Sequence, residues 1–288
     1  MSDESPLQQL QEVCLEAHSV IRDEIVFLFQ RYGRNTPAVV PTLDELFRYL
    51  SSRSQAVSFL LSWGYAWDAE IILRSFYETA AKILFICFSE ENDKLTLLDE
   101  FWNKLGSISD RRRARKAEYN FRDDGTVSSE IFKAFTDERV FDLDVKGNKA
   151  ERKRLEQKWS FAEIVNALEG RVVGGKPLQG MLNLLHMYGV CSHLVHADSI
   201  ALDMMADRKM RPPEELQLLK SGHAARIMSD QVSLTWFCAD ALRHHFKGEF
   251  SNEGKMIHAF QKPMDFAAPI QSAFEESQRA FYENLQQR

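Results

Sequence analysis

The chain has 288 residues, a formal net charge of −6, 44% hydrophobic residues and 27% charged residues. These are ordinary values for a globular protein, and they exclude intrinsic disorder and a fibrous architecture. The polar, acidic start predicts no signal peptide, and no uncharged apolar run is long enough for a membrane span. Four scattered cysteines without a CxxC pair are typical of reduced thiols in a cytoplasmic protein.

Hydrophobic residues recur with the helical period along most of the chain. The pattern predicts an all-α protein, a multi-helix bundle with a long buried central helix over residues 64–88. The helix before it is expected to begin at a capping box formed by Thr42 and Glu45. No convincing strand is present. The helices that we predict cover residues 5–31, 43–63, 64–88, 93–122, 128–137, 149–169, 178–205, 214–246 and 268–285, with an exposed loop at 138–150.

The predicted organisation is a single helical-bundle domain over residues 1–246, with an excursion at 104–158. Residues 247–288 form a C-terminal extension with one helix, and its first part, up to Lys262, is expected to be a loop. This last helix either packs on the body or on a second subunit. We therefore expect a homo-oligomer.

The predicted central helix is apolar on most sides but carries one stripe of alternating charge. Residues at four-residue spacing share a helical face, so this stripe either faces solvent or lines a polar cleft. Its outer members are the ones expected to face solvent. In order, the stripe consists of Glu70, Arg74, Glu78 and Lys82.

A later predicted helix places His186, His193 and His196 on one stripe, with Ser192 four residues before the last of them. Hydrogen-bonded core histidines would give the same pattern. A metal site that combines His193 and His196 with Glu78 is disfavoured, because the Glu-x-x-His repeats of di-metal helical bundles are absent. We therefore expect neither a metal nor another cofactor.

Two segments reverse the acidic balance of the chain. Residues 104–122 hold seven Lys or Arg against two acidic residues, and residues 146–158 hold six against two. These cations either lie on a solvated helix face or contact RNA or another anionic partner. The cations that we predict to bind nucleic acid are Arg111, Arg112, Arg113, Arg115, Lys116, Arg152, Lys153 and Arg154.

Two separated motifs carry a resemblance to a known family. The chain contains R-S-x-x-E from Arg74 to Glu78 and S-x-x-V-H from Ser192 to His196. In this it resembles a family of bacterial and phage-associated helical proteins classed as a domain of unknown function, over roughly residues 43–205. The resemblance implies that these four residues converge in space. We add His193 and Asp68 to the same polar cluster.

More distantly, the chain is similar to the HEPN ribonucleases of bacterial defence and toxin systems, helical bundles that commonly dimerise and cut RNA without a metal. Their paired Arg and His lie about four to six residues apart on one helix. Here residues 189–191 are Gly-Val-Cys, so Arg74 would take the place of that arginine beside His196.

This similarity implies a metal-independent RNA-cleaving or RNA-binding effector in phage defence or a toxin–antitoxin system, which acts alone or with a partner protein from the same operon. His196 would be the general acid/base, Arg74 would stabilise charge on the phosphate, and Glu78 would orient one of them. The alternative is a non-catalytic binding or assembly protein in which the same side chains, Ser192 included, form a structural polar network.

Overall fold

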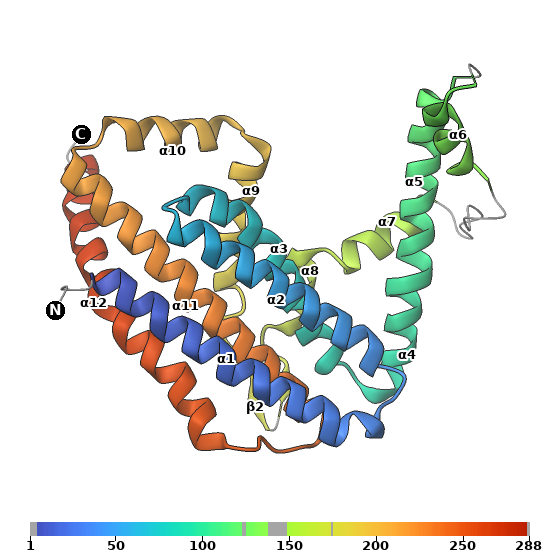
Figure 1. Cartoon of the computed structure of the whole chain (residues 1–288), viewed down its shortest axis with the longest axis horizontal. Helices are drawn as coiled ribbons and strands as arrows, with labels where there is room; N and C mark the ends of the chain where they lie inside the picture. The colour runs from blue at the N-terminus through green and yellow to red at the C-terminus, as the bar shows by residue number, and fades with distance from the viewer. Residues whose placement is uncertain (1–4, 123–124, 138–148, 174, 287–288) are drawn as a thin grey trace. The chain divides into compact units, whose positions relative to one another are not determined.

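The computed structural model describes residues 5–122, 125–137, 149–173 and 175–286, and these are helical almost throughout (Figure 1). The chain divides into two compact units, which we call the bundle unit (Met1–Phe88 and Val165–Arg288) and the inserted unit (Ser89–Ile164). The predicted all-α multi-helix bundle is confirmed. No helix in the described part of the chain is both long and apolar enough to cross a membrane.

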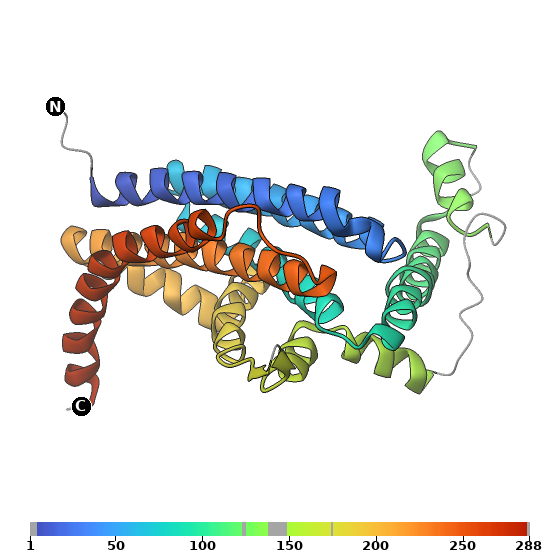
Figure 2. The same cartoon turned by 90° about the horizontal axis from the view of Figure 1, so that it is seen from below.

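Five long helices build the bundle unit, and they lie side by side in both views (Figures 1 and 2). At their centre is α3, which packs against α2, α9 and α11. From Thr79 to Phe88 every side chain of this segment is buried except that of Lys82, which is half-buried. The five helices are α1 (Pro6–Tyr32), α2 (Val40–Ser62), α3 (Ala66–Cys87), α11 (Pro213–Phe246) and α12 (Glu253–Gln286).

The start of α2 differs from the prediction. A short 3-10 turn, η1 (Gly33–Asn35), follows α1, and the chain is already helical at Val40. The backbone N–H of Leu43 donates to the carbonyl of Val39, which is the N-cap residue, so Thr42 lies buried within the first turn of α2. The capping box expected at Thr42 is therefore wrong. A capping box is present instead at the start of α1, between Ser5 and Gln8.

The predicted helix over residues 178–205 is wrong as one element, because the chain forms two helices, α9 (Asn183–His196) and α10 (Ser199–Met210). Ala197 between them adopts the left-handed conformation, with φ of 47°. The carboxylate of Asp198 then accepts from the N–H of Ala201 and caps α10. Before α9 the chain forms a small antiparallel hairpin that was not predicted, between β1 (Val172–Val173) and β2 (Lys176–Pro177).

The last helix begins earlier than predicted. The segment up to Lys262, expected to be a loop, is helical from Glu253, where the side chain of Asn252 accepts from the N–H of Lys255. This helix continues through Pro263 and Pro269 and packs along α1 and α11. Tertiary packing thus overrides the local tendency of proline to end a helix.

In the inserted unit, α4 (Glu91–Asp99) passes through a π-helical turn, η2 (Glu100–Lys104), into α5 (Leu105–Asn120). Within η2 the carboxylate of Glu100 accepts from Lys158 at 2.6 Å and from the indole N–H of Trp159 at 3.0 Å. The unit also contains α6 (Val127–Ala134) and α7 (Lys149–Lys158), and α8 (Phe161–Leu168) leads back to the bundle unit. Most of the loop predicted at 138–150 lies outside the described residues.

Candidate functional site

Two helices of the bundle unit bring a polar cluster together, which we call the α3–α9 cluster. Arg74 and Glu78 are one turn apart on α3, and Tyr188, Ser192 and His196 follow one another at four-residue steps on α9. Residues spaced by four share a helical face, and the two helices pack directly against each other. The four site residues predicted from the motifs therefore lie together in the structure.

The guanidinium of Arg74 is the centre of this cluster. Its Nε donates to the hydroxyl of Tyr188 at 3.1 Å and to Glu78 Oε1 at 3.3 Å. Its Nη1 donates to Ser192 Oγ at 3.3 Å and lies 3.5 Å from Nε2 of His196. One cation thus links residues from two helices, and it bonds to Ser192 across them.

The donor and the acceptor in the contact between Arg74 and His196 are defined. A guanidinium only donates hydrogen bonds, so Nε2 of His196 must present its lone pair toward Nη1. The imidazole is exposed, whereas the side chain of Arg74 is only 25% exposed. The cluster therefore combines a fixed cation with a titratable ring that solvent and solutes can reach.

Glu78 and Tyr188 hold the guanidinium in place. The hydroxyl of Tyr188 donates to Glu78 Oε1 at 2.7 Å while it accepts from Arg74, and the guanidinium also lies over the Tyr188 ring. Burial raises the pKa of Tyr188 to about 12, and the bond to Glu78 adds to this rise. Burial alone would lower the pKa of Arg74, but its bonds to Tyr188 and Glu78 hold that pKa above its usual value. The pair remains ionised arginine and neutral tyrosine near pH 7.

Tyr188 was not among the predicted site residues. The signal that could have found it is the four-residue step that it shares with Ser192 and His196 on one face of α9. Cys191, on another face of the same helix, is buried, and burial raises the pKa of its thiol to about 12. It therefore packs as a neutral side chain behind the cluster and is no nucleophile.

The two additional members predicted for this cluster lie elsewhere. The ring of His193 bonds through Nδ1 to Asp198 at 2.6 Å, so it supports the turn between α9 and α10. Asp68 lies exposed in the first turn of α3, where a carboxylate complements the helix dipole. In the described part of the chain, neither forms a hydrogen bond or an ion pair with Arg74. In the described residues, no group of three or more His, Cys, Asp or Glu side chains has a geometry that could hold a metal ion.

One member of the predicted charged stripe is buried. Glu70 is 0% exposed and was expected to face solvent, which is wrong. Its Oε1 accepts from Arg226 at 2.7 Å and from His223 Nδ1 at 2.9 Å, both on α11. Arg226 also donates to Asp230, which in turn accepts from the hydroxyl of Tyr77. This buried ion network fixes α3 against α11, one turn below Arg74.

The inserted unit gathers the two basic segments around one groove between α5 and α7, which we call the basic groove. Its volume is about 400 Å³, and its lining contains one carboxylate, Glu156, which pairs with Arg112. Of the predicted cations, Arg113, Lys116 and Arg154 do not line it. The cations that do are Arg111, Arg112, Arg115, Lys149, Arg152 and Lys153.

Comparison with known proteins places the chain in a family. Residues 44–211 match DUF5677, described as a family of unknown function. The match covers more than half of the chain, so this protein belongs to the DUF5677 family. It spans α2 from near its start, α3, the inserted unit, α9 and α10, and thus includes both the α3–α9 cluster and the basic groove. No curated protein and no solved structure matches the chain.

Proposed function

We propose that this protein is a metal-independent ribonuclease and that the α3–α9 cluster is its active site. The observation that carries the proposal is the position of the Arg74 guanidinium, 3.5 Å from Nε2 of the exposed His196. Cleavage of a phosphodiester needs a group that moves a proton and a cation that stabilises the charge developing on the phosphate oxygens. This pair supplies both.

The proposed reaction uses the 2′-hydroxyl of RNA as the nucleophile. Nε2 of His196 takes the proton of that hydroxyl, and the oxygen attacks the adjacent phosphorus. The bond from phosphorus to the 5′-oxygen breaks, and the departing oxygen takes a proton from water. The products are a 2′,3′-cyclic phosphate and a 5′-hydroxyl end. Because the substrate provides its own nucleophile, the reaction requires no metal-bound water.

Arg74 is suited to its proposed role by the way it is held. Glu78, Tyr188 and Ser192 bond to Nε and Nη1, and Nη2 has no partner among the described residues. One edge of a fixed guanidinium is therefore available to a phosphate oxygen, a geometry that arginine favours. Preorganised donors of this kind stabilise a transition state without reorganisation during the reaction.

We propose that the basic groove binds the RNA backbone. Six of its lining residues are cations, and its one carboxylate is already paired with Arg112. Single-stranded nucleic acid is held mainly by contacts between cations and successive phosphates. A concave cluster of six cations with a single carboxylate in its lining fits such a ligand better than it fits a solvated helix face.

The proposed context is phage defence or a toxin–antitoxin system in the cytoplasm, with a homo-oligomer as the working form and a partner protein from the same operon. These proposals rest on the resemblance to HEPN ribonucleases. Expression of wild type and His196→Ala in cells, scored for growth arrest and RNA integrity with and without phage, tests the context. Light scattering of the purified protein tests the oligomeric state.

A second reading treats the cluster as a structural network that joins α3 to α9. The bonds of Arg74 to Tyr188 and Ser192, which cross between the helices, favour it. The two readings differ at His196, which is exposed and contributes little packing. Replacement of His196 removes a catalytic group if the protein is a ribonuclease. It changes the stability of the protein very little if the cluster is only a structural network.

The test is cleavage of an end-labelled single-stranded RNA by the purified full chain in EDTA. We expect cyclic phosphate ends, a rate lowered about 10²- to 10⁴-fold by His196→Ala, and a wild-type rate for His186→Ala. His186 is the matched control, an exposed histidine on the same helix. A wild-type rate for His196→Ala, or RNA left intact by wild type at stoichiometric enzyme, would overturn the proposal.

A further inference from the structure

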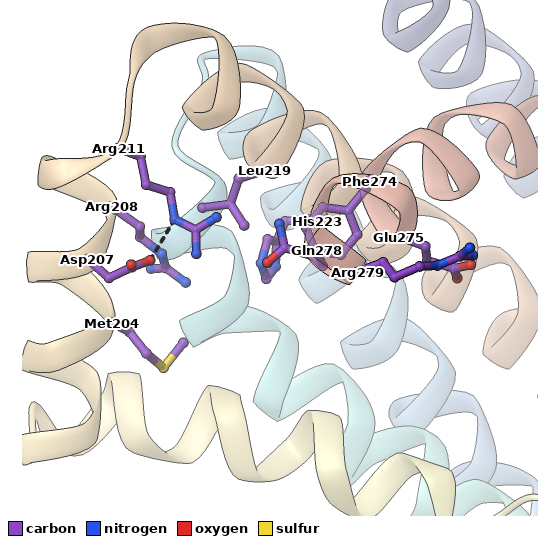
Figure 3. A pocket seen from close by; sticks show the side chains of 10 residues that line it. All are labelled: Met204, Asp207, Arg208, Arg211, Leu219, His223, Phe274, Glu275, Gln278 and Arg279. Atoms are coloured by element: carbon purple, nitrogen blue, oxygen red, sulfur yellow. Dashed lines mark hydrogen bonds and ion pairs between the residues drawn. The ribbon is translucent and has the colours of Figure 1, made fainter. Parts of the chain in front are cut away.

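A polar cavity lies in the bundle unit between α10, α11 and α12 (Figure 3). Its volume is about 500 Å³, within the range of small-molecule sites. None of its lining residues belongs to the α3–α9 cluster. Its walls combine cations with apolar side chains, among them Arg208, Arg211, His223, Arg279, Leu219 and Phe274.

Arg208 is the feature of this cavity that most needs explanation. The residue is only 6% exposed, and its guanidinium contacts the sulfur of Met205 at 3.5 Å and the ring of Trp67, neither of which carries a charge. Burial lowers the pKa of Arg208 to about 10, although the charge of Glu70 partly offsets this effect. A buried guanidinium without a hydrogen-bonded carboxylate lacks the usual compensation for its desolvation.

Two carboxylates near the cavity, Asp207 and Glu70, are bonded to other groups, and a third, Glu275, lies exposed in its lining. Asp207 accepts from Nε of Arg211 at 2.7 Å, the dashed contact in Figure 3. Oε1 of Glu70 accepts from His223 and Arg226. No carboxylate of the described residues bonds to Arg208. Apart from the weak bond of Nη1 to the sulfur of Met205, its N–H groups have water or a ligand in the cavity as acceptors.

The opposite wall of the cavity has a different chemistry. Figure 3 places His223 and Phe274 together across the cavity from Arg208. The Nδ1 of His223 is bonded to Glu70, and its Nε2 has no partner among the described residues. Leu219 adds an apolar surface. One side therefore suits an anion and the other suits a flat, largely apolar ring that carries polar atoms.

We propose that this cavity binds a small organic phosphate, with the phosphate at Arg208 and Arg211 and a planar ring against Phe274. Phosphate is favoured over a carboxylate because two neighbouring guanidinium groups match its double charge and its several oxygens. Arg279, which pairs with Glu276, also lies in the lining. A nucleoside monophosphate has this combination of groups and fits the volume.

Titration calorimetry of the full chain tests the proposal, with the four 5′-ribonucleoside monophosphates as probes. Inorganic phosphate, which lacks the ring, and the four nucleosides, which lack the phosphate, are the control ligands. We expect at least one monophosphate to bind at least tenfold more tightly than inorganic phosphate and than its own nucleoside. Arg208→Gln and Arg211→Gln should each weaken that binding at least tenfold, and Lys209→Gln, an exposed neighbour on α10, should leave it unchanged.

Two outcomes would overturn the proposal. One is that no monophosphate binds more tightly than inorganic phosphate, and the other is wild-type affinity in both arginine variants. Circular dichroism shows whether each variant is folded, and Arg211→Gln, at a half-buried position, decides the outcome if Arg208→Gln fails to fold. The RNA-cleavage assay is separate, so failure here leaves the proposed ribonuclease activity untouched.

Discussion

The Nη1 atom of Arg74 lies 3.5 Å from Nε2 of His196, although the two residues are 122 positions apart in the chain. The contact exists because α9 returns to pack against α3 after the whole inserted unit. On α9 the residues at 188, 192 and 196 face Arg74, while Cys191 faces the core. A single helix thus supplies the proposed proton-transfer group and part of the support for the cation beside it.

Replacement of Glu78 by Gln should lower the rate of RNA cleavage by about 10- to 100-fold, because a misplaced Arg74 stabilises the transition state less well. The side chain of Glu78 is 33% exposed, so the free energy of unfolding should change by less than about 1 kcal/mol. Single-turnover cleavage and urea unfolding measure the two effects. Glu45→Gln, at an exposed position on α2, is the control. Equal rates for Glu78→Gln and wild type would remove Glu78 from a positioning role.

The sequence was sufficient to predict that Arg74 and His196 lie close together, but not that Glu70 is buried. Four-residue spacing identifies which side chains share a helical face, and the two motifs indicated which faces meet. Spacing does not reveal where a helix turns away from solvent. Glu70 is buried because α11 brings Arg226 and His223 to it, and nothing in the sequence near Glu70 signals that partner helix.

Replacement of Glu70 by Gln should destabilise the protein by about 3–5 kcal/mol, the usual cost of removing one partner from a buried ion pair. Burial alone would raise the pKa of Glu70, but His223 and Arg226 hold that pKa below its usual value, so the carboxylate is ionised and bonded. Urea unfolding of Glu70→Gln and of Asp68→Asn, an exposed carboxylate on the same helix, measures the difference. The control should stay within about 0.5 kcal/mol of wild type. Equal midpoints for the two variants would contradict a stabilising role for this network.

The basic segments show a similar limit of sequence analysis. Composition identified the cations, but not that α5 and α7 face each other across a groove, because that pairing depends on tertiary packing. Three of the eight predicted residues, Arg113, Lys116 and Arg154, do not line the groove. A run of consecutive arginines necessarily points in several directions around a helix.

This difference provides a matched pair of variants for RNA binding. Arg115→Gln/Arg152→Gln removes two cations of the basic groove, whereas Lys116→Gln/Arg154→Gln removes two that do not line it. The first should weaken binding and should reduce the slope of log affinity against log salt by about 0.7 per lost phosphate contact. Fluorescence anisotropy with a labelled single-stranded RNA over a salt series measures both quantities. The same loss in both double variants would show that general charge, and not the groove, binds RNA.

His18 should make the stability of the protein depend on pH. It lies half-buried on α1 beside Ser58, Leu61 and Gln231, and burial lowers its pKa from 6.5 to about 4. Between these values the unfolded chain binds a proton that the folded chain does not. The free energy of unfolding therefore falls by about 1.4 kcal/mol per pH unit as the pH decreases from about 6.5 to 4, which is about 3 kcal/mol in total. Below about pH 4 the contribution of His18 no longer changes. Urea unfolding of His18→Gln from pH 7.5 to 4 should lack this slope, and His186→Gln should retain it. A slope identical to wild type in His18→Gln would assign the acid sensitivity to other groups.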